Sequence, residues 1–187
     1  MIVIMSSDLL SQLKRYGGRE LTLRAGTYLF HRGDAVRQLY YVIDGEVQLV
    51  RHQACGSAIV LQCATPGVIV AEASLFSEHY HCDAIAPGQA RVGCVAKEAF
   101  IRLFRNDADF AQAWAAYLAR GIQTARLRGE ILSLKTVSER LDAWLDWHGE
   151  LPPRGEWKQV AMQIAVSPEA LYREIAKRRK GEAVAPP

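Results

Sequence analysis

AGTYLFHRGD at residues 25–34, followed by LYYVIDGEVQLVR at residues 39–51, is the stretch that decides the fold. Short runs of Leu, Val, Ile and Tyr alternate in it with single glycines such as Gly33 and Gly45. Glycine adopts the positive φ angles that tight turns require, so these positions predict connections between short strands. Residues 47–51 alternate imperfectly between apolar and polar, which fits one buried face. Short strands about ten residues apart predict a sandwich or barrel.

The β-type pattern ends near Val95, and a helical pattern follows over residues 107–134, which contain no proline. Such a helix would be roughly 40 Å long at 1.5 Å per residue. Mostly apolar or small residues recur along this helix at alternating intervals of four and three positions, which is the spacing of a heptad seam. This spacing predicts that the helix pairs with the same helix of a second copy. Packing against the β domain alone is the alternative, but that domain can cover only part of the length. The predicted dimer seam consists of Trp114, Leu118, Gly121, Ala125, Arg128 and Leu132.

The last fifty residues predict shorter helices separated by turns. A helix begins near Val137, a turn follows at residues 151–155, and a short amphipathic helix covers residues 157–164. Before the last helix, at residues 168–180, Ser167 is a good N-cap, Pro168 suits the first helical position and Glu169 suits the positive end of the helix dipole. Leu171 and Ile175 are spaced to pack inward.

The composition is that of a globular protein, with 187 residues, 50% hydrophobic and 23% charged. The net charge of +3 permits a nucleic-acid partner without requiring one. No apolar run approaches the ~20 residues that span a bilayer, and residues 1–5 are too short for a signal-peptide core. We therefore expect a cytoplasmic protein without a membrane partner. The four cysteines form no Cys-x-x-Cys pair and are expected to be thiols, mostly buried.

The opening stretch resembles the cyclic-nucleotide-binding β-roll of the CRP/FNR regulators, and residues 160–173 resemble the helix-turn-helix of that family. The resemblance implies an α+β fold with a jelly-roll-like β-roll sensor at 1–106, a long dimerisation helix at 107–134 and a helix-turn-helix domain at 135–187. The few residues after 180 predict that the usual β-hairpin wing is not complete. The implied function is sequence-specific transcription regulation by a homodimer on a pseudo-palindromic DNA operator, with RNA polymerase as a further partner and no enzymatic activity.

The resemblance places Glu169 and Arg173 at positions that read base edges in the major groove, whereas Pro168 stands where the family has its first recognition arginine. A solvated basic helix end is the alternative interpretation of this region. The predicted DNA-binding residues are Ser167, Glu169, Tyr172, Arg173, Lys177 and Arg178.

The effector pocket of the family corresponds to Ala71, Glu72, Cys82 and Asp83. Members that bind cyclic AMP have Gly-Glu at the first pair, and Arg followed by Ser or Thr at the second. A phosphate needs a cation and donors, whereas this chain offers a thiol and a carboxylate. We therefore expect an effector other than cyclic AMP.

Three residues next to this pocket, His79, His81 and Cys82, are of the types that bind borderline metals or a haem iron. The sequence leaves open a metal, a haem, a thiol sensor or a polar loop whose histidines face water. It also leaves open a ligand-sensing or protein-interaction module that does not read an operator. A cupin-like metalloenzyme is disfavoured because no Glu and third His follow at cupin spacing.

Overall fold

The computed structural model describes residues 7–53 and 58–182. The fold divides into two compact units, one ending at Arg120 and one beginning at Gly121. No helix in the described part of the chain is both long enough and apolar enough to cross a membrane.

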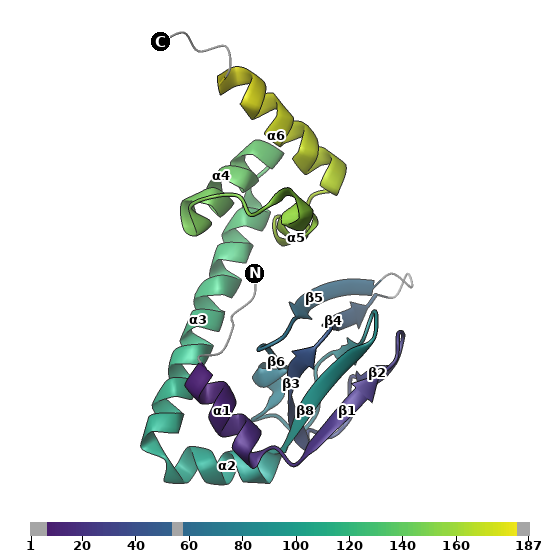
Figure 1. Cartoon of the computed structure of the whole chain (residues 1–187), viewed down its shortest axis with the longest axis vertical. Helices are drawn as coiled ribbons and strands as arrows, with labels where there is room; N and C mark the ends of the chain where they lie inside the picture. The colour runs from purple at the N-terminus through teal and green to yellow at the C-terminus, as the bar shows by residue number, and fades with distance from the viewer. Residues whose placement is uncertain (1–6, 54–57, 183–187) are drawn as a thin grey trace. The chain divides into compact units, whose positions relative to one another are not determined.

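The first unit is built on two four-stranded antiparallel sheets, ordered β1-β8-β3-β6 and β2-β7-β4-β5 (Figure 1). The strands are β1 (Arg19–Leu23), β2 (Tyr28–Phe30), β3 (Gln38–Asp44), β4 (Val47–His52), β5 (Ala58–Ala64), β6 (Ile69–Val70), β7 (Asp83–Ile85) and β8 (Ala90–Ala96). The predicted β-roll is therefore confirmed, and it ends one residue after the expected Val95.

The core of this β-roll lies between the two sheets and is formed by the strand side chains that point inward. Val42, Leu49 and Val92 are each at most 5% exposed. Two positions require glycine because another part of the chain approaches closely. A Cβ on Gly45, whose φ is 76°, would lie 2.3 Å from the Gln89 carbonyl oxygen. At Gly93, a Cβ would collide with the ring of Tyr41. The glycines of the opening pattern thus mark real turns.

Helices cover the outer face of the first sheet. They are α1 (Ser7–Tyr16), α2 (Lys97–Asn106) and the beginning of α3 (Ala108–Ser133). Phe100, Phe110 and Trp114 are each at most 1% exposed and pack in one cluster with Leu39 of β3. Trp114 is therefore part of the core of its own unit. Its assignment to the dimer seam was wrong, because the β-roll already buries its indole ring.

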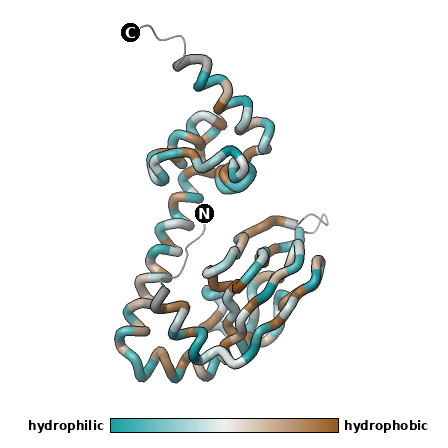
Figure 2. Tube along the Cα trace, in the orientation of Figure 1, coloured by the Kyte–Doolittle hydropathy of each residue, from teal (hydrophilic) through white to brown (hydrophobic). Residues whose placement is uncertain are grey.

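The second unit contains the end of α3 and the helices α4 (Val137–His148), α5 (Trp157–Gln163) and α6 (Pro168–Glu182), with a 3-10 turn, η2 (Arg154–Glu156), before α5. Along α6 hydrophobic and hydrophilic residues interleave (Figure 2). Leu171 and Ile175 are at most 4% exposed and pack inward, as predicted.

Local signals explain where these helices begin. The Thr136 hydroxyl accepts a hydrogen bond from the Glu139 backbone N–H at 3.1 Å, and the Glu139 carboxylate accepts one from the Thr136 backbone N–H at 2.9 Å. This reciprocal pair starts α4. Ser167 similarly accepts from the Ala170 backbone N–H at 3.2 Å and starts α6. The α5–α6 connection passes through Ala165, whose φ is +52°.

Candidate effector pocket and DNA-binding surface

The predicted effector pocket begins at Ala71, which follows β6 and precedes a short 3-10 turn, η1 (Glu72–Ser74). Ala71 is buried and holds a left-handed backbone with φ 60° and ψ 37°. An L-residue with a Cβ holds this conformation at a cost of roughly 1–2 kcal/mol. The position therefore favours glycine, which is the residue that the resembled family carries there.

The side chain of Glu72 points into the protein rather than into bulk solvent. Its Oε2 atom is buried and has no hydrogen-bond partner in the described residues. Burial raises the pKa of the Glu72 carboxyl above its ordinary value. The pKa of the nearby Tyr117 phenol, on α3, is raised by burial first and by the charge of Glu72 second. The pocket thus holds a carboxyl group with free hydrogen-bonding capacity.

Cys82 and Asp83 stand where the family holds the cyclic phosphate, and neither can replace that machinery. Cys82 is 0% exposed and belongs to the core between the sheets, and burial raises the pKa of its thiol. The Asp83 carboxylate accepts a hydrogen bond from the Arg32 backbone N–H at 3.0 Å and lies 3.2 Å from His31 Nδ1. A cyclic nucleotide held through its phosphate therefore does not fit the residues present.

A second group of contacts holds the segment before β7, which contains His81. The Ser74 hydroxyl and His81 Nδ1 lie 2.6 Å apart, and Ser74 is 0% exposed. The Arg51 guanidinium donates to the His81 carbonyl oxygen at 3.1 Å. The pKa of the His81 imidazole is lowered by burial first and by the Arg51 charge second. Sequence reasoning missed Arg51 because only the pairing of β4 with β7, which aligns Val50 with Asp83, brings it here.

The three predicted metal ligands do not converge on one point. His79 is exposed and forms an isolated β-bridge with Ala35, whereas the Cys82 side chain lies in the core and His81 contacts Ser74. Within residues 7–53 and 58–182 no group of three or more His, Cys, Asp or Glu side chains could hold a metal ion. The predicted metal site at His79, His81 and Cys82 was wrong, because the chain directs these side chains to different surroundings although they lie within four residues.

In the second unit, Glu169, Arg173 and Lys177 form a row along the exposed side of α6. They are four residues apart, which places them on one helix face. The pKa of the Glu169 carboxyl is lowered by hydrogen bonds to its own backbone N–H and to Ser167, and further by the charges of Arg173 and Lys158. Glu169 is therefore held as a carboxylate at the start of the helix.

Arg178 has a structural role instead of the predicted contact with DNA. Its guanidinium lies 2.6 Å from Asp142 Oδ1 and 3.0 Å from Glu174 Oε1, and it donates to the Ser138 carbonyl oxygen at 3.0 Å. These contacts join α6 to the beginning of α4. The prediction for Arg178 was wrong, because Asp142, which is 36 positions away in the sequence, occupies its guanidinium.

An aromatic side chain that sequence reasoning did not single out, Trp157, supports the α5–α6 surface together with the predicted Tyr172. The rings of Trp157 and Tyr172 lie 5.3 Å apart between centroids. The guanidinium of Arg154 lies 5.9 Å from the Tyr172 ring, and that of Arg179 lies 5.4 Å from the Trp157 ring. Tyr172 is partly buried, and Tyr172 and Trp157 each hold one further cation, Arg154 and Arg179 respectively, beside the row on α6. The available signal was a Trp three residues after an Arg, at Arg154 and Trp157.

The chain thus consists of a β-roll, the long helix α3 and a set of shorter helices, α4 to α6. Residues 20–107 match the family model described as "Cyclic nucleotide-binding domain". Residues 20–107 thus carry the fold of a cyclic nucleotide-binding domain, which agrees with the resemblance and confirms the α+β class expected from the sequence.

A curated relative is the "Cyclic AMP receptor protein" of Thermus thermophilus, which is 30% identical over 117 residues. The alignment covers 62% of this chain and 54% of the relative, so the chain matches about half the length of that protein.

Solved structures share the fold over most of the chain. FixK2 from Bradyrhizobium japonicum has a TM-score of 0.66 at 17% identity, covering 88% of this chain and 85% of that one. The c-di-GMP responsive global regulator CLP from Xanthomonas campestris has a TM-score of 0.63 at 18% identity, covering 97% and 96%. The Catabolite Activator Protein of Thermus thermophilus has a TM-score of 0.57 at 23% identity, covering 97% and 87%. At these identities the likeness establishes the fold alone.

Proposed function

We propose that this protein is a sequence-specific, DNA-binding transcription regulator of CRP/FNR type that acts as a homodimer and responds to an effector other than cyclic AMP. The observation that carries the proposal is the row of Glu169, Arg173 and Lys177 on α6, opposite the buried Leu171 and Ile175. A recognition helix needs this division, with a packed apolar side and a polar side free to enter the major groove.

The individual side chains suggest a division of roles on DNA. Arg173 has the fork geometry that recognises guanine edges, and a bidentate contact of this kind is worth about 1–3 kcal/mol of discrimination. Lys177 lies one turn further and suits a phosphate contact. Ser167 at the N-cap and Tyr172 beside Trp157 fix the start and the tilt of the helix. Arg178 has no place in this interface.

The dimer proposal rests on the exposed side of α3. Ile122 is 54% exposed and Leu132 is 42% exposed, which is unusual for large apolar residues on a helix. Both belong to a row of apolar and small residues on α3 that are alternately three and four positions apart. The small residues in this row allow a second helix to approach closely. Relative to the seam expected from the sequence, this row keeps Leu118, Ala125 and Leu132 and moves the other positions by one residue. Its members are Ala115, Leu118, Ile122, Ala125, Gly129 and Leu132.

The effector proposal rests on the charges of the pocket. Glu72 contributes a buried carboxyl oxygen without a partner, and Asp83 contributes a carboxylate held by the loop that follows β2. An anion here would approach the Asp83 carboxylate, and the nearby Arg51 guanidinium already donates to the His81 carbonyl oxygen. A neutral or cationic effector that donates hydrogen bonds to Glu72 fits this pocket better than a cyclic phosphate does.

The DNA function is tested by selecting bound sequences from random duplexes with wild-type protein and with Arg173→Ala. We expect the wild type to enrich a pseudo-palindrome with half-sites about one helical turn apart. Arg173→Ala should bind more weakly and lose preference at one position of each half-site. Arg24→Ala, which removes an exposed arginine from the β-roll, is the matched control and should select the same sequences as the wild type.

One observation favours a second candidate, a ligand-sensing or protein-interaction module. Pro168 occupies the position at which the resembled family carries its first recognition arginine. If the selection enriches no palindrome and Arg173→Ala binds DNA as the wild type does, this second function replaces the first.

The effector class is tested by thermal unfolding with millimolar cyclic AMP or cyclic GMP. A ligand present at a hundred times its dissociation constant would stabilise the folded chain by about 2.7 kcal/mol. We expect no shift of the melting temperature with either nucleotide. A clear shift with the unmodified protein would contradict the argument from Cys82 and Asp83.

A further inference from the structure

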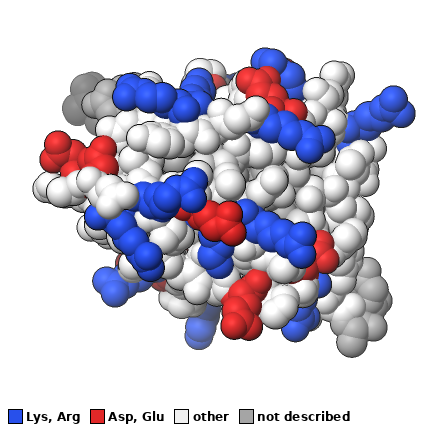
Figure 3. Space-filling view, turned by 90° about the horizontal axis from the view of Figure 1, so that it is seen from below, with Lys and Arg blue, Asp and Glu red and all other residues white. Residues whose placement is uncertain are grey.

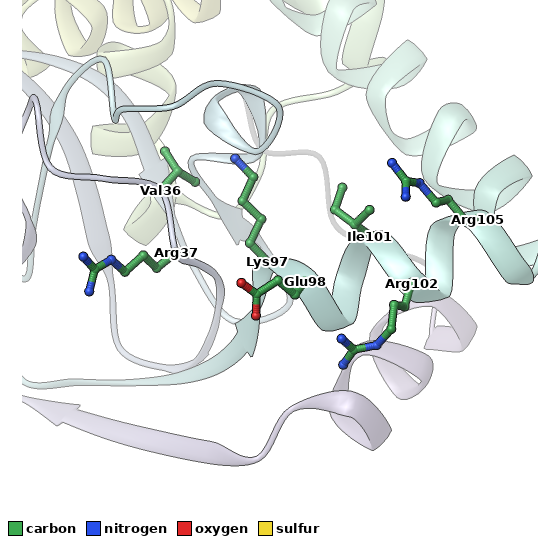
Figure 4. Close-up of a pocket in the computed structure, with 7 residues that line it drawn as sticks. All are labelled: Val36, Arg37, Lys97, Glu98, Ile101, Arg102 and Arg105. Atoms are coloured by element: carbon green, nitrogen blue, oxygen red, sulfur yellow. The ribbon is translucent and has the colours of Figure 1, made fainter.

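A hollow of about 660 Å³ lies on the β-roll unit, between the segment that precedes β3 and helix α2. None of the effector-pocket residues lines it. Its walls come from Val36 and Arg37 on one side and from residues of α2 on the other (Figure 4). Four of the lining side chains are basic and one, Glu98, is acidic.

The basic side chains around this hollow are largely unneutralised. The guanidinium groups of Arg37, Arg102 and Arg105 make no hydrogen bond or ion pair with any residue that the structure describes. Lys97 donates through Nζ to the Ser77 carbonyl oxygen at 2.7 Å, which leaves its charge uncompensated. On the face of the molecule seen from below, the side on which α2 lies in Figure 1, Lys and Arg dominate (Figure 3).

The hollow also has an apolar floor. Val36 is 6% exposed, and Ile101 is partly buried against the helix-covered sheet. Lys97, Ile101 and Arg105 follow one another along one row of α2, so the apolar side chain lies between two cations (Figure 4). The volume of the hollow falls within the range of roughly 300–1,000 Å³ that is typical of small-molecule sites.

We propose that this hollow is a second ligand site, which binds a small molecule that carries two or more anionic groups and has the size of a nucleotide polyphosphate. Guanidinium groups pair with phosphate oxygens through two parallel hydrogen bonds, and three of them are available here. The apolar floor suits the ring of such a ligand, and Glu98 can accept a hydrogen bond from its hydroxyl or amino groups. The proposal is independent of DNA recognition and of the effector pocket.

The test is calorimetric titration of the full chain with magnesium-free ATP at about 150 mM salt, where the Debye length of ~8 Å suppresses diffuse attraction. We expect saturable binding with one ATP per chain and no binding of adenosine, which lacks the anionic groups. Arg102→Gln should raise the dissociation constant about tenfold or more, because it removes a charged partner of the phosphates. Arg24→Gln makes the same charge change outside the hollow and should leave the dissociation constant within about twofold.

Three results would overturn the proposal. One is the absence of saturable ATP binding to a wild-type chain that unfolds cooperatively. Another is an equal loss of affinity in Arg24→Gln and Arg102→Gln, which would indicate diffuse charge attraction instead of a site. The third is binding of a deca-glutamate peptide, sensitive to Arg102→Gln, by a chain that does not bind ATP. That result would assign the surface to an acidic protein partner. Melting temperatures of both variants establish that each is folded.

Discussion

At the scale of the residue, two alanines hold backbone conformations that glycine adopts more readily. Ala71 has a φ of 60° and Ala165 a φ of 52°. Relieving this geometry gains roughly 1–2 kcal/mol, and the extra freedom of glycine in the unfolded chain offsets about 0.5–1 kcal/mol of the gain. We expect Ala71→Gly to raise the free energy of unfolding by about 0.5–1 kcal/mol in urea titrations. Ala73→Gly is the control, since Ala73 has no positive φ and should gain nothing.

The carboxyl of Glu72 gives the fold a pH dependence of defined sign. Because burial raises its pKa in the folded chain, the folded state holds this proton more tightly than the unfolded state does. Ionisation of Glu72 therefore costs stability, and the cost grows as the pH rises from the unfolded value near 4.5 through the folded value. We expect Glu72→Gln to be more stable than the wild type at pH 7, with the difference shrinking as the pH falls toward 4.5 and lost below it.

Thermal unfolding of both proteins across this pH range checks that expectation, and Glu78→Gln, at an exposed position on the same loop, is the control. A stability difference between Glu72→Gln and wild type that stays constant with pH would mean that the carboxyl is not the titrating group.

At the scale of the element, helix α6 is held to α4 by Arg178. Its guanidinium contacts Asp142, Glu174 and the Ser138 carbonyl oxygen. Hydrogen bonds to charged groups contribute about 1.5–3 kcal/mol, and the partly exposed pair with Asp142 falls at or below the low end. We expect Arg178→Met to lower the free energy of unfolding by about 1–2 kcal/mol while DNA affinity, measured well below the unfolding transition, changes little. Arg173→Met should do the reverse, weakening DNA binding without loss of stability.

Elements were predictable wherever the determining signal is local. Gly45 marks its turn because the turn needs a positive φ, which glycine adopts readily. Leu171 and Ile175 share a helix face because they are four residues apart. The role of Arg178 was not predictable, because its partner Asp142 belongs to another helix. Trp114 was placed in the dimer seam because spacing does not tell which of two surfaces, the β-roll or a second copy, covers a helix face.

The effector pocket shows the same limit. The departures at Cys82 and Asp83 could be identified from the sequence, and so could their consequence for a phosphate. The directions of the side chains could not, because Cys82 faces the core whereas Asp83 reaches the loop at His31 and Arg32. A cluster of metal-binding residue types in a short segment therefore overstated how closely those groups meet in space.

At the scale of the whole molecule, the proposed DNA recognition and the proposed dimer depend on each other. One recognition helix reads a half-site of only a few base pairs, and two such helices on a symmetric dimer read a palindrome with far greater discrimination. The exposed row on α3 is therefore expected to control operator affinity even though it is not expected to touch DNA. Weakening the dimer should lower operator affinity and make it depend on protein concentration, while non-specific binding by each chain remains.

The variant that separates these effects is Ile122→Glu. In a two-fold dimer each substituted residue faces the equivalent region of the partner helix, so the change buries like charges and removes apolar contact at once. We expect Ile122→Glu to sediment as a monomer at micromolar concentration and to lose palindrome binding. Gln123→Glu adds the same charge one residue further, about 100° around the helix and away from the row, and should remain a dimer. Cooperative thermal unfolding of both variants distinguishes loss of the dimer from loss of the fold. If Ile122→Glu sediments as a stable dimer with wild-type operator affinity, α3 does not carry the interface, and a dimeric regulator would have to associate through another surface.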